Sequence, residues 1–291
     1  MSKFTLINKE YNILIVGLGL LGGSYAQGLT DVGFDVCAID TNQKAIDYAL
    51  AKGYIKEGTT LVTKEFVSRF DLVIFALYPK VFVQWLKEYQ DYLKPSAIIT
   101  DVTGIKTWLE QEIKSFIRDD ISYVLAHPMA GREVYGVENA DKNIFKGANY
   151  IVIENEPDNI KMQSAISLVE DIGRLLGFKN VVRLTANEHD EMIGFLSQLT
   201  HCIAVSLMTC KNSEHLVQYT GDSFRDLTRI AKINENMWSE LFILNKKELL
   251  SQMDLFLNQF TKLKETIEKD DIEEMKNIMR ISSKNRSYFD K

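Results

Sequence analysis

The chain has 291 residues, of which 46% are hydrophobic and 25% are charged, and its formal net charge is −6. This length allows two domains with separate cores, and the composition is that of a globular protein rather than a disordered one. The acidic balance argues against a nucleic-acid or anionic-membrane partner.

Targeting signals and cysteines bear on the compartment. Residues 1–12 lack the apolar core of a signal peptide, and no apolar run approaches the roughly 18 residues of a transmembrane helix. Cys37, Cys202 and Cys210 are widely spaced and form neither a CxxC pair nor a metal-type cluster. We therefore expect a cytoplasmic protein with no disulfide framework and no metal site.

The first predicted strand, residues 12–16, leads directly into a glycine-rich turn. Its apolar run is typical of a parallel strand that is buried on both faces. The turn fits G-x-G-x-x-G, whose glycines permit a tight turn, the approach of a pyrophosphate and close packing of the next helix. The alternative is a strand–turn–helix that binds no nucleotide. The residues expected to contact a dinucleotide here are Gly17, Gly19, Leu20, Leu21 and Gly22.

The second predicted strand, residues 34–39, ends at Asp40, about 20 residues beyond the turn. A carboxylate at this point can accept hydrogen bonds from both ribose hydroxyls and would repel a 2′-phosphate. Thr41 and Asn42 follow, without an arginine to bind that phosphate. The sequence therefore predicts NAD rather than NADP as the cofactor.

Short apolar strands alternate with helical stretches until about residue 184, which indicates a doubly wound α/β domain of the Rossmann type. Beyond that point the apolar residues recur at helical spacing, which predicts long helices. We predict an NAD-binding domain over residues 1–184 and an all-helical domain over 185–291, whose surplus apolar surface favours a homodimer. The further strands are predicted at 71–76, 97–101, 122–126, 149–153 and 181–184.

In an open parallel sheet, ligands bind beyond the carboxyl ends of the strands. Leu77 follows the strand at 71–76, Thr103 follows the strand at 97–101, and His127 follows the strand at 122–126. At the end of a central strand, His127 can take a proton from an alcohol as hydride leaves the carbon. The alternative for a lone histidine is a packed or capping role. We expect His127 to be catalytic, and Leu77 and Thr103 to contact the cofactor.

Two polar pairs stand out in the predicted helical domain. Ser197 and His201 are four residues apart and share one helical face, which suits a cleft lining. Arg225 and Arg229 have the same spacing, and their guanidinium groups can hold carboxylates through two hydrogen bonds each. The alternatives are a polar patch on an amphipathic helix and a surface face of ion pairs.

A series of motifs runs along residues 10–250 in unbroken order. They are GLGLLGGS at 17–24, TDV at 100–102 with Lys106, HPMAG at 127–131 with GVENA at 136–140, His189-Asp190, Ser197 with His201, RD at 225–226, TRIA at 228–231 and MW at 237–238. Together these motifs closely resemble the prephenate dehydrogenase family. The resemblance implies a Rossmann domain followed by a helical dimerisation domain, with the active site between them.

The resemblance also implies a reaction in tyrosine biosynthesis, in which prephenate and NAD⁺ give 4-hydroxyphenylpyruvate, CO₂ and NADH. By matching position, His127 should hydrogen-bond the C4 hydroxyl of prephenate and act as the base. Arg229 should bind a substrate carboxylate, and Arg225 is a weaker candidate for orienting the substrate. The remaining residues implied at the substrate site are Ser197, His201 and Trp238.

Two positions depart from the family pattern. The family commonly has Asp-Val-Gly-Ser-x-Lys, whose serine assists the catalytic histidine, whereas this chain has Gly104 at the serine position. The nearest hydroxyl is that of Thr103, so we expect Thr103 or a water molecule to substitute. Arg132 stands where a small polar residue often follows HPMAG, and its charge favours a dianionic substrate.

Several alternatives stay open at this point. The family includes arogenate dehydrogenases, and the motifs alone do not separate arogenate from prephenate, although Asp40 with NAD favours prephenate. A 3-hydroxyacid or 6-phosphogluconate-like dehydrogenase would need a catalytic lysine in the helical domain, where this chain has His201 and two arginines. A non-catalytic NAD sensor is disfavoured by the presence of both His127 and Arg229. We expect a monofunctional enzyme.

Overall fold

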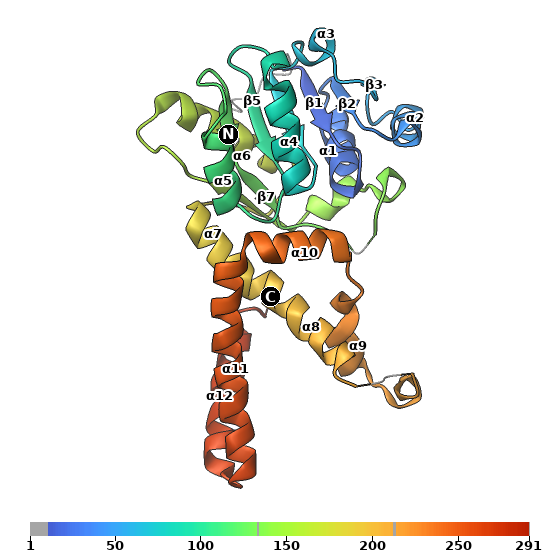
Figure 1. Cartoon of the computed structure of the whole chain (residues 1–291). Helices are drawn as coiled ribbons and strands as arrows, with labels where there is room; N and C mark the ends of the chain where they lie inside the picture. The colour runs from blue at the N-terminus through green and yellow to red at the C-terminus, as the bar shows by residue number, and fades with distance from the viewer. Residues whose placement is uncertain (1–10, 133, 212–213, 291) are drawn as a thin grey trace, which may run out of the picture.

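A six-stranded parallel sheet forms the centre of the N-terminal part of the computed structural model, which describes residues 11–132, 134–211 and 214–290 (Figure 1). The strand order is β3-β2-β1-β4-β5-β6, the order of a doubly wound dinucleotide-binding sheet, so the predicted fold class is confirmed. The strands are β1 (Ile13–Val16), β2 (Val36–Ile39), β3 (Glu57–Thr59), β4 (Leu72–Phe75), β5 (Ile98–Asp101) and β6 (Ser122–Val124).

A second sheet corrects one of the sequence predictions. It contains β7 (Ala126–Pro128), β8 (Asn149–Ile153) and β9 (Asn180–Leu184), with β7 antiparallel to β8 and β8 parallel to β9. The predicted strand at 122–126 is therefore two strands, because the chain leaves the edge of the main sheet after Val124 and enters the second sheet. His127 lies within β7, opposite Ile151 of β8, and not at the end of a central strand.

Helices cover both faces of the main sheet, and local sequence explains where several of them begin and end. α4 starts with Pro79 at its first turn, where a missing N–H is harmless. The side chain of Asn159 caps the start of α6, and Gly177 in the left-handed conformation ends it. The helices are α1 (Leu20–Asp31), α2 (Gln43–Ala51), α3 (Lys64–Val67), α4 (Pro79–Tyr89), α5 (Thr107–Lys114) and α6 (Ile160–Leu176).

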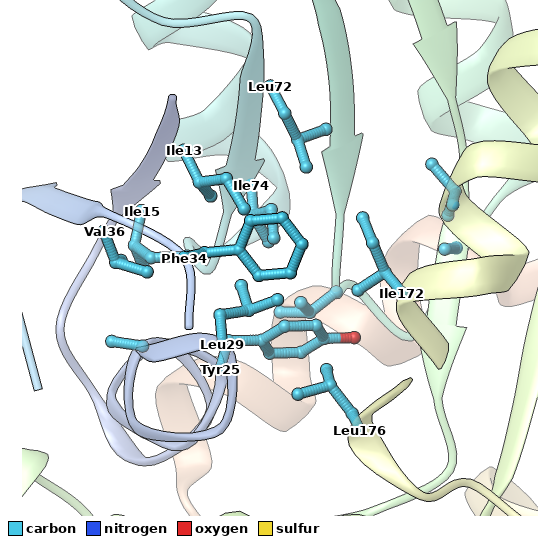
Figure 2. Packing of buried hydrophobic residues seen from close by; sticks show 14 of the residues in the cluster. Ile13, Ile15, Tyr25, Leu29, Phe34, Val36, Leu72, Ile74, Ile172 and Leu176 are labelled. Atoms are coloured by element: carbon cyan, nitrogen blue, oxygen red, sulfur yellow. The ribbon is translucent and has the colours of Figure 1, made fainter. Parts of the chain in front are cut away.

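The packing of α1 and α6 holds the glycine turn in place. Figure 2 shows Tyr25 and Leu29 of α1 between strand residues and the side chains of Ile172 and Leu176 of α6. At Gly28 of α1, a Cβ atom would lie 2.6 Å from the Leu176 side chain, so the two helices approach each other closely. Each fully buried side chain of this size contributes about 1.5–3 kcal/mol. The start of α1, which follows the turn, is therefore fixed on a rigid core. The strand and loop residues labelled in Figure 2 are Ile13, Ile15, Phe34, Val36, Leu72 and Ile74.

The C-terminal part is helical. A continuous helix contains α7 (Ala186–Ile193), a π-helical turn (Gly194–Leu199) and α8 (Thr200–Thr209), and a capping box of Thr185 and Glu188 starts it. In Figure 1, α11 and α12 form a long hairpin that projects away from the sheets, while α8 leads to α9 in another direction. The other helices are α9 (Asp222–Thr228), α10 (Glu235–Leu244), α11 (Lys246–Glu268) and α12 (Ile272–Ser287).

Large apolar side chains on these helices are exposed in the single chain. Leu255 and Phe260 of α11 are 58% and 60% exposed, and Met279 of α12 is 57% exposed.

The helical run Ala186–Thr209 is long and apolar enough to cross a membrane by length and composition alone, which corrects our expectation that no segment comes close. One such helix is weak evidence for a membrane span, since the core helix of a globular protein passes the same test.

Candidate active site

The glycines of the turn have separate structural roles. Gly17 has a φ of +97°, and a Cβ atom at Gly22 would lie 1.8 Å from the carbonyl oxygen of Gly17. These two positions therefore require glycine because of the backbone itself. A Cβ atom at Gly19 would meet nothing within 4 Å, so this position faces open space at the start of α1. The turn thus offers a surface on which a pyrophosphate can approach the helix N-terminus.

Asp40 lies directly behind this turn. One carboxylate oxygen accepts a hydrogen bond of 2.6 Å from the Leu18 N–H, and the other accepts one of 2.7 Å from the Asn42 N–H. A carboxylate can accept about four hydrogen bonds, so capacity remains for ribose hydroxyls. The geometry fits a dinucleotide whose adenosine ribose lies beside β2.

A cleft of about 420 Å³ separates the sheet domain from the helices. It is bordered by the glycine turn, by the ends of β4 and β5, by β7 with the loop that follows it, and by the π-helical turn and α10. The structure brings together in this cleft many of the residues predicted from the sequence. They are Gly19, Leu20, Leu21, Gly22, Leu77, Thr103, His127, Ser197 and Trp238.

Other predicted residues lie elsewhere. The His201 ring packs against the indole of Trp238, with centroids 3.7 Å apart, and its Nδ1 lies 2.8 Å from the Ser197 carbonyl oxygen. His201 therefore supports one wall of the cleft. Arg225 is exposed and lies 3.5 Å from Asp222 within α9. Neither Arg225 nor Arg229 is among the residues that line the cleft of the single chain, so their substrate contacts stay predictions.

Among the described residues that line the cleft, His127 is the one histidine. Its Nδ1 is 2.8 Å from Nε2 of His189, and Nδ1 of His189 is 2.7 Å from a carboxylate oxygen of Asp190. Burial holds the pKa of His127 well below its ordinary value, and neighbouring His189 and Lys106 lower it further. Burial also lowers the pKa of His189, against an opposing hydrogen bond to Asp190. Both rings are therefore neutral at pH 7.

A buried ion pair lies beneath this histidine. Nζ of Lys106 is 2.6 Å from an Asp101 carboxylate oxygen and 2.7 Å from the carbonyl oxygen of Ala126, the residue before His127. The hydroxyl of Thr103 donates to Asp101 over 2.5 Å, so it is directed toward the ion pair rather than toward His127. Thr103 thus lines the cleft while its hydroxyl stabilises the residues below.

Gly104 has a direct bearing on the histidine. A Cβ atom at this position would lie 3.7 Å from Nε2 of His127, so a serine here would reach the ring. The glycine leaves that nitrogen facing the cleft.

Sequence reasoning did not assign a role to His189 or Asp190, because the contact between His127 and His189 joins residues 62 positions apart. The adjacent His-Asp pair in a helix was the signal available.

The glycine turn, the acidic residue behind it and a partly buried histidine facing the same cleft define an oxidoreductase of the dinucleotide-binding class. Residues 26–176 match the family model of the prephenate dehydrogenase nucleotide-binding domain, and residues 185–281 match the prephenate dehydrogenase dimerization domain. The chain belongs to the prephenate dehydrogenase family.

Similar proteins agree with this assignment. The chain is 26% identical to the prephenate dehydrogenase of Bacillus subtilis (strain 168), over 96% of this chain and 75% of that protein. It is also 26% identical to the cyclohexadienyl dehydrogenase of Zymomonas mobilis, over 89% of both chains. The crystal structure of prephenate dehydrogenase from A. aeolicus, in complex with hydroxyphenyl propionate and NAD⁺, superposes with a TM-score of 0.86 at 28% identity, over 96% of this chain and 98% of that chain.

The comparisons bear on three predictions. The match to a nucleotide-binding domain confirms the predicted NAD cofactor, which a similar crystal structure also contains. The oxidoreductase class follows from the family. The dimerization domain includes the apolar helical run Ala186–Thr209, so a homodimer accounts for apolar surface that the single chain leaves exposed.

Replacing Asp40 tests the cofactor assignment. We expect Asp40→Ala to raise the KM for NAD⁺ roughly tenfold, equivalent to about 1.4 kcal/mol, and to raise the relative use of NADP⁺. Initial rates with both cofactors measure this effect. Asp35→Ala is the matched control, because Asp35 is an exposed aspartate that pairs with Lys56. An unchanged ratio of NAD⁺ to NADP⁺ use in Asp40→Ala would contradict the assignment.

Proposed function

We propose that this chain is a cytoplasmic enzyme that oxidises prephenate with NAD⁺ and releases 4-hydroxyphenylpyruvate, CO₂ and NADH in tyrosine biosynthesis. The observation that carries the proposal is the position of His127, which faces a cleft between the glycine turn and the helices. Family membership supports the reaction class. Arogenate, in which an ammonium group replaces the keto oxygen of prephenate, is the alternative substrate.

The reaction needs one base at a fixed place. A bound NAD⁺ would supply the acceptor for the hydride that leaves C4 of prephenate. His127 accepts the proton of the C4 hydroxyl at Nε2, so that C4 becomes a carbonyl carbon. The C1–CO₂ bond then breaks, its electron pair completes the aromatic ring, and the oxygen at C4 becomes a phenolate. His127 returns the proton to that oxygen, and no net proton is consumed.

The chain's residues divide the binding of the two ligands. The backbone at Gly19 and the start of α1 would hold the pyrophosphate, and Asp40 would hold the adenosine ribose. Leu77 would border the nicotinamide. Trp238, supported by His201, gives the substrate ring an apolar wall.

Arg132 suits a substrate with two carboxylates, which prephenate and arogenate both have. Among the described residues that line the cleft, Arg132 carries the one permanent positive charge. Its guanidinium is about half exposed and lies 3.1 Å from Asp141, so it can also reach a carboxylate in the cleft. Prephenate has two carboxylates, and a guanidinium can bind each through paired hydrogen bonds. Arg229 and Arg225 are the candidates for the second carboxylate.

The proposal includes the organisation of the chain. We propose an NAD-binding domain over residues 1–184 and a substrate and dimerisation domain over residues 185–291. This boundary rests on the end of β9 at Leu184 and the start of α7 at Ala186. A homodimer would form through the helical domain.

A direct assay tests the function. NADH formation is measured with prephenate and with arogenate, side by side at equal concentrations. A higher kcat/KM for prephenate supports the proposal, and a higher kcat/KM for arogenate would assign the alternative substrate. No turnover of either compound by the folded protein would contradict the proposed function.

His127→Asn tests the role of the base. The amide cannot accept and return the proton, so we expect kcat to fall by roughly 100-fold or more while the affinity for prephenate changes little. Steady-state rates and equilibrium binding measure the two effects. A kcat near that of the wild type would remove His127 from the mechanism.

Two arginine variants test the substrate contacts. We expect Arg132→Ala and Arg229→Ala each to raise the KM for prephenate, by an amount equivalent to about 1.5–3 kcal/mol for a charge-assisted hydrogen bond. Arg118→Ala is a control, because Arg118 is a guanidinium distant from the cleft that binds Asp120. An unchanged KM in either the Arg132 or the Arg229 variant would mean that the other arginine, or Arg225, binds the carboxylate.

The lowered pKa of His127 predicts an acid-shifted pH profile. Its neutral form is the active base, and a lowered pKa keeps that form present below the ordinary histidine value of about 6.5. We therefore expect kcat/KM to stay constant down to that pH and to fall only at lower pH. An acid limb at or above the ordinary value would contradict this assignment. The charged and titratable groups around the ring are His189, Asp190, Lys106 and Asp101.

A further inference from the structure

A hydrogen-bonded row of two imidazoles and one carboxylate lies behind the cleft. Asp190 lies at its buried end, where one carboxylate oxygen accepts from the Lys106 N–H and the other from the Thr107 N–H, both over 2.8 Å. Burial alone would raise the pKa of Asp190, but the hydrogen bond from His189 and the backbone hydrogen bond lower it overall. Asp190 is therefore an ionised carboxylate, which only accepts hydrogen bonds.

The ionised carboxylate determines the proton positions along the row. Because Asp190 only accepts, the proton of neutral His189 lies on Nδ1, which donates to Asp190 over 2.7 Å. Nε2 of His189 is then an acceptor. The 2.8 Å contact from this nitrogen to Nδ1 of His127 requires the proton of His127 on Nδ1. Nε2 of His127 is left without a proton and can act as the base.

We propose that His189 and Asp190 are positioning residues that hold His127 in the tautomer with a free Nε2 toward the cleft. The proposal rests on the proposed function only in taking His127 as the base. Nε2 of His127 has no protein hydrogen-bond partner among the described residues, and Gly104 supplies no side chain near it. The row through His189 is thus the contact that orients the ring.

The row also suits the charged form of His127 during turnover. When Nε2 takes the substrate proton, the ring becomes a cation whose Nδ1–H still donates to neutral His189. The Asp190 carboxylate lies one ring farther away and stabilises that charge. The positive charge of Lys106 would repel this cation, but its Nζ is 2.6 Å from the Asp101 carboxylate, which largely neutralises it. The same polar row thus serves both states of the base.

Substitutions of His189 separate positioning from packing. Leucine removes both hydrogen bonds, whereas glutamine can still accept from His127 and donate to Asp190. We expect His189→Leu to lower kcat on the order of 100-fold with the KM for prephenate within about threefold, and His189→Gln to recover most of the loss. His215→Asn is the control, because His215 is an exposed histidine outside the cleft. Equal kcat values in the leucine and glutamine variants would indicate packing alone and overturn the proposal.

Asp190→Asn tests the direction of the row. An amide can turn so that its NH₂ group donates to Nδ1 of His189, which moves the protons to Nε2 of both rings and blocks the base. We expect a loss of kcat of similar size to that of His189→Leu, and an acid limb of kcat/KM that moves away from its wild-type pH. A kcat and pH profile equal to those of the wild type, in a folded variant, would overturn the proposal.

A tautomer measurement does not depend on the substrate. The chain has four histidines, so nitrogen-15 labelling of histidine gives a spectrum simple enough to assign with single variants. We expect the His127 proton on Nδ1 in the wild type and a shift toward Nε2 in Asp190→Asn. A wild-type proton on Nε2 at neutral pH would overturn the proposal. Absence of prephenate turnover with the expected tautomer would instead reject only the proposed function.

Discussion

The carboxylate of Asp190 is the contact on which the relation between the two parts of the molecule depends. It accepts the two N–H groups at the start of α5 in the sheet domain, although it belongs to α7 in the helical part. The backbone carbonyl oxygen of Asp190 also accepts a hydrogen bond of 2.9 Å from the side chain of Asn245, which lies between α10 and α11. One residue therefore joins the sheet domain, α7 and the α10–α11 corner. The cleft has a defined width because both of its walls are tied to this point.

The buried ion pair of Lys106 and Asp101 lies next to this contact in the sheet domain. A fully buried Lys106 loses several kcal/mol of hydration unless every N–H finds an acceptor. Its three ammonium protons have three nearby acceptors, which are Asp101, Thr103 and the carbonyl oxygen of Ala126. Tyr123 donates to the remaining Asp101 oxygen over 3.0 Å. The pair is fully satisfied, and it pins the backbone next to His127 at a place where the chain changes sheets.

The sequence allowed the sheet to be predicted wherever local pattern decides the structure. β1, β2 and β4 are runs of apolar residues buried on both faces, and such runs have few alternatives. β3 was missed because Glu57–Thr59 is a half-exposed segment whose strand form depends on pairing with β2. The apolar residues around Leu125 give no sign that the chain passes from one sheet to the other there.

The site was predictable to the same extent. The glycine turn has a backbone requirement that is visible in the residue types, and His127 was found from its place after a strand, even though that strand belongs to a second sheet. The partnership of His127 with His189 arises from tertiary packing between distant segments. Helical spacing predicted that Ser197 and His201 both line the cleft. In the structure Ser197 and Trp238 line it, and His201 packs against Trp238. Spacing alone does not say which face of a helix meets a ligand.

The π-helical turn Gly194–Leu199 has a consequence for how the molecule tolerates change in length. A π-helical turn holds about one more residue than an α-helical turn, so removing one residue here would let the wide turn close to α-helical geometry while α7 and α8 keep their relation. Ser197 and Gln198 lie in this turn and line the cleft, while α8 carries the apolar surface beyond it. A single-residue deletion here would therefore change the directions of the cleft-lining side chains in the turn while α8 keeps its orientation. The extra residue of this segment is therefore a constraint on the shape of the cleft.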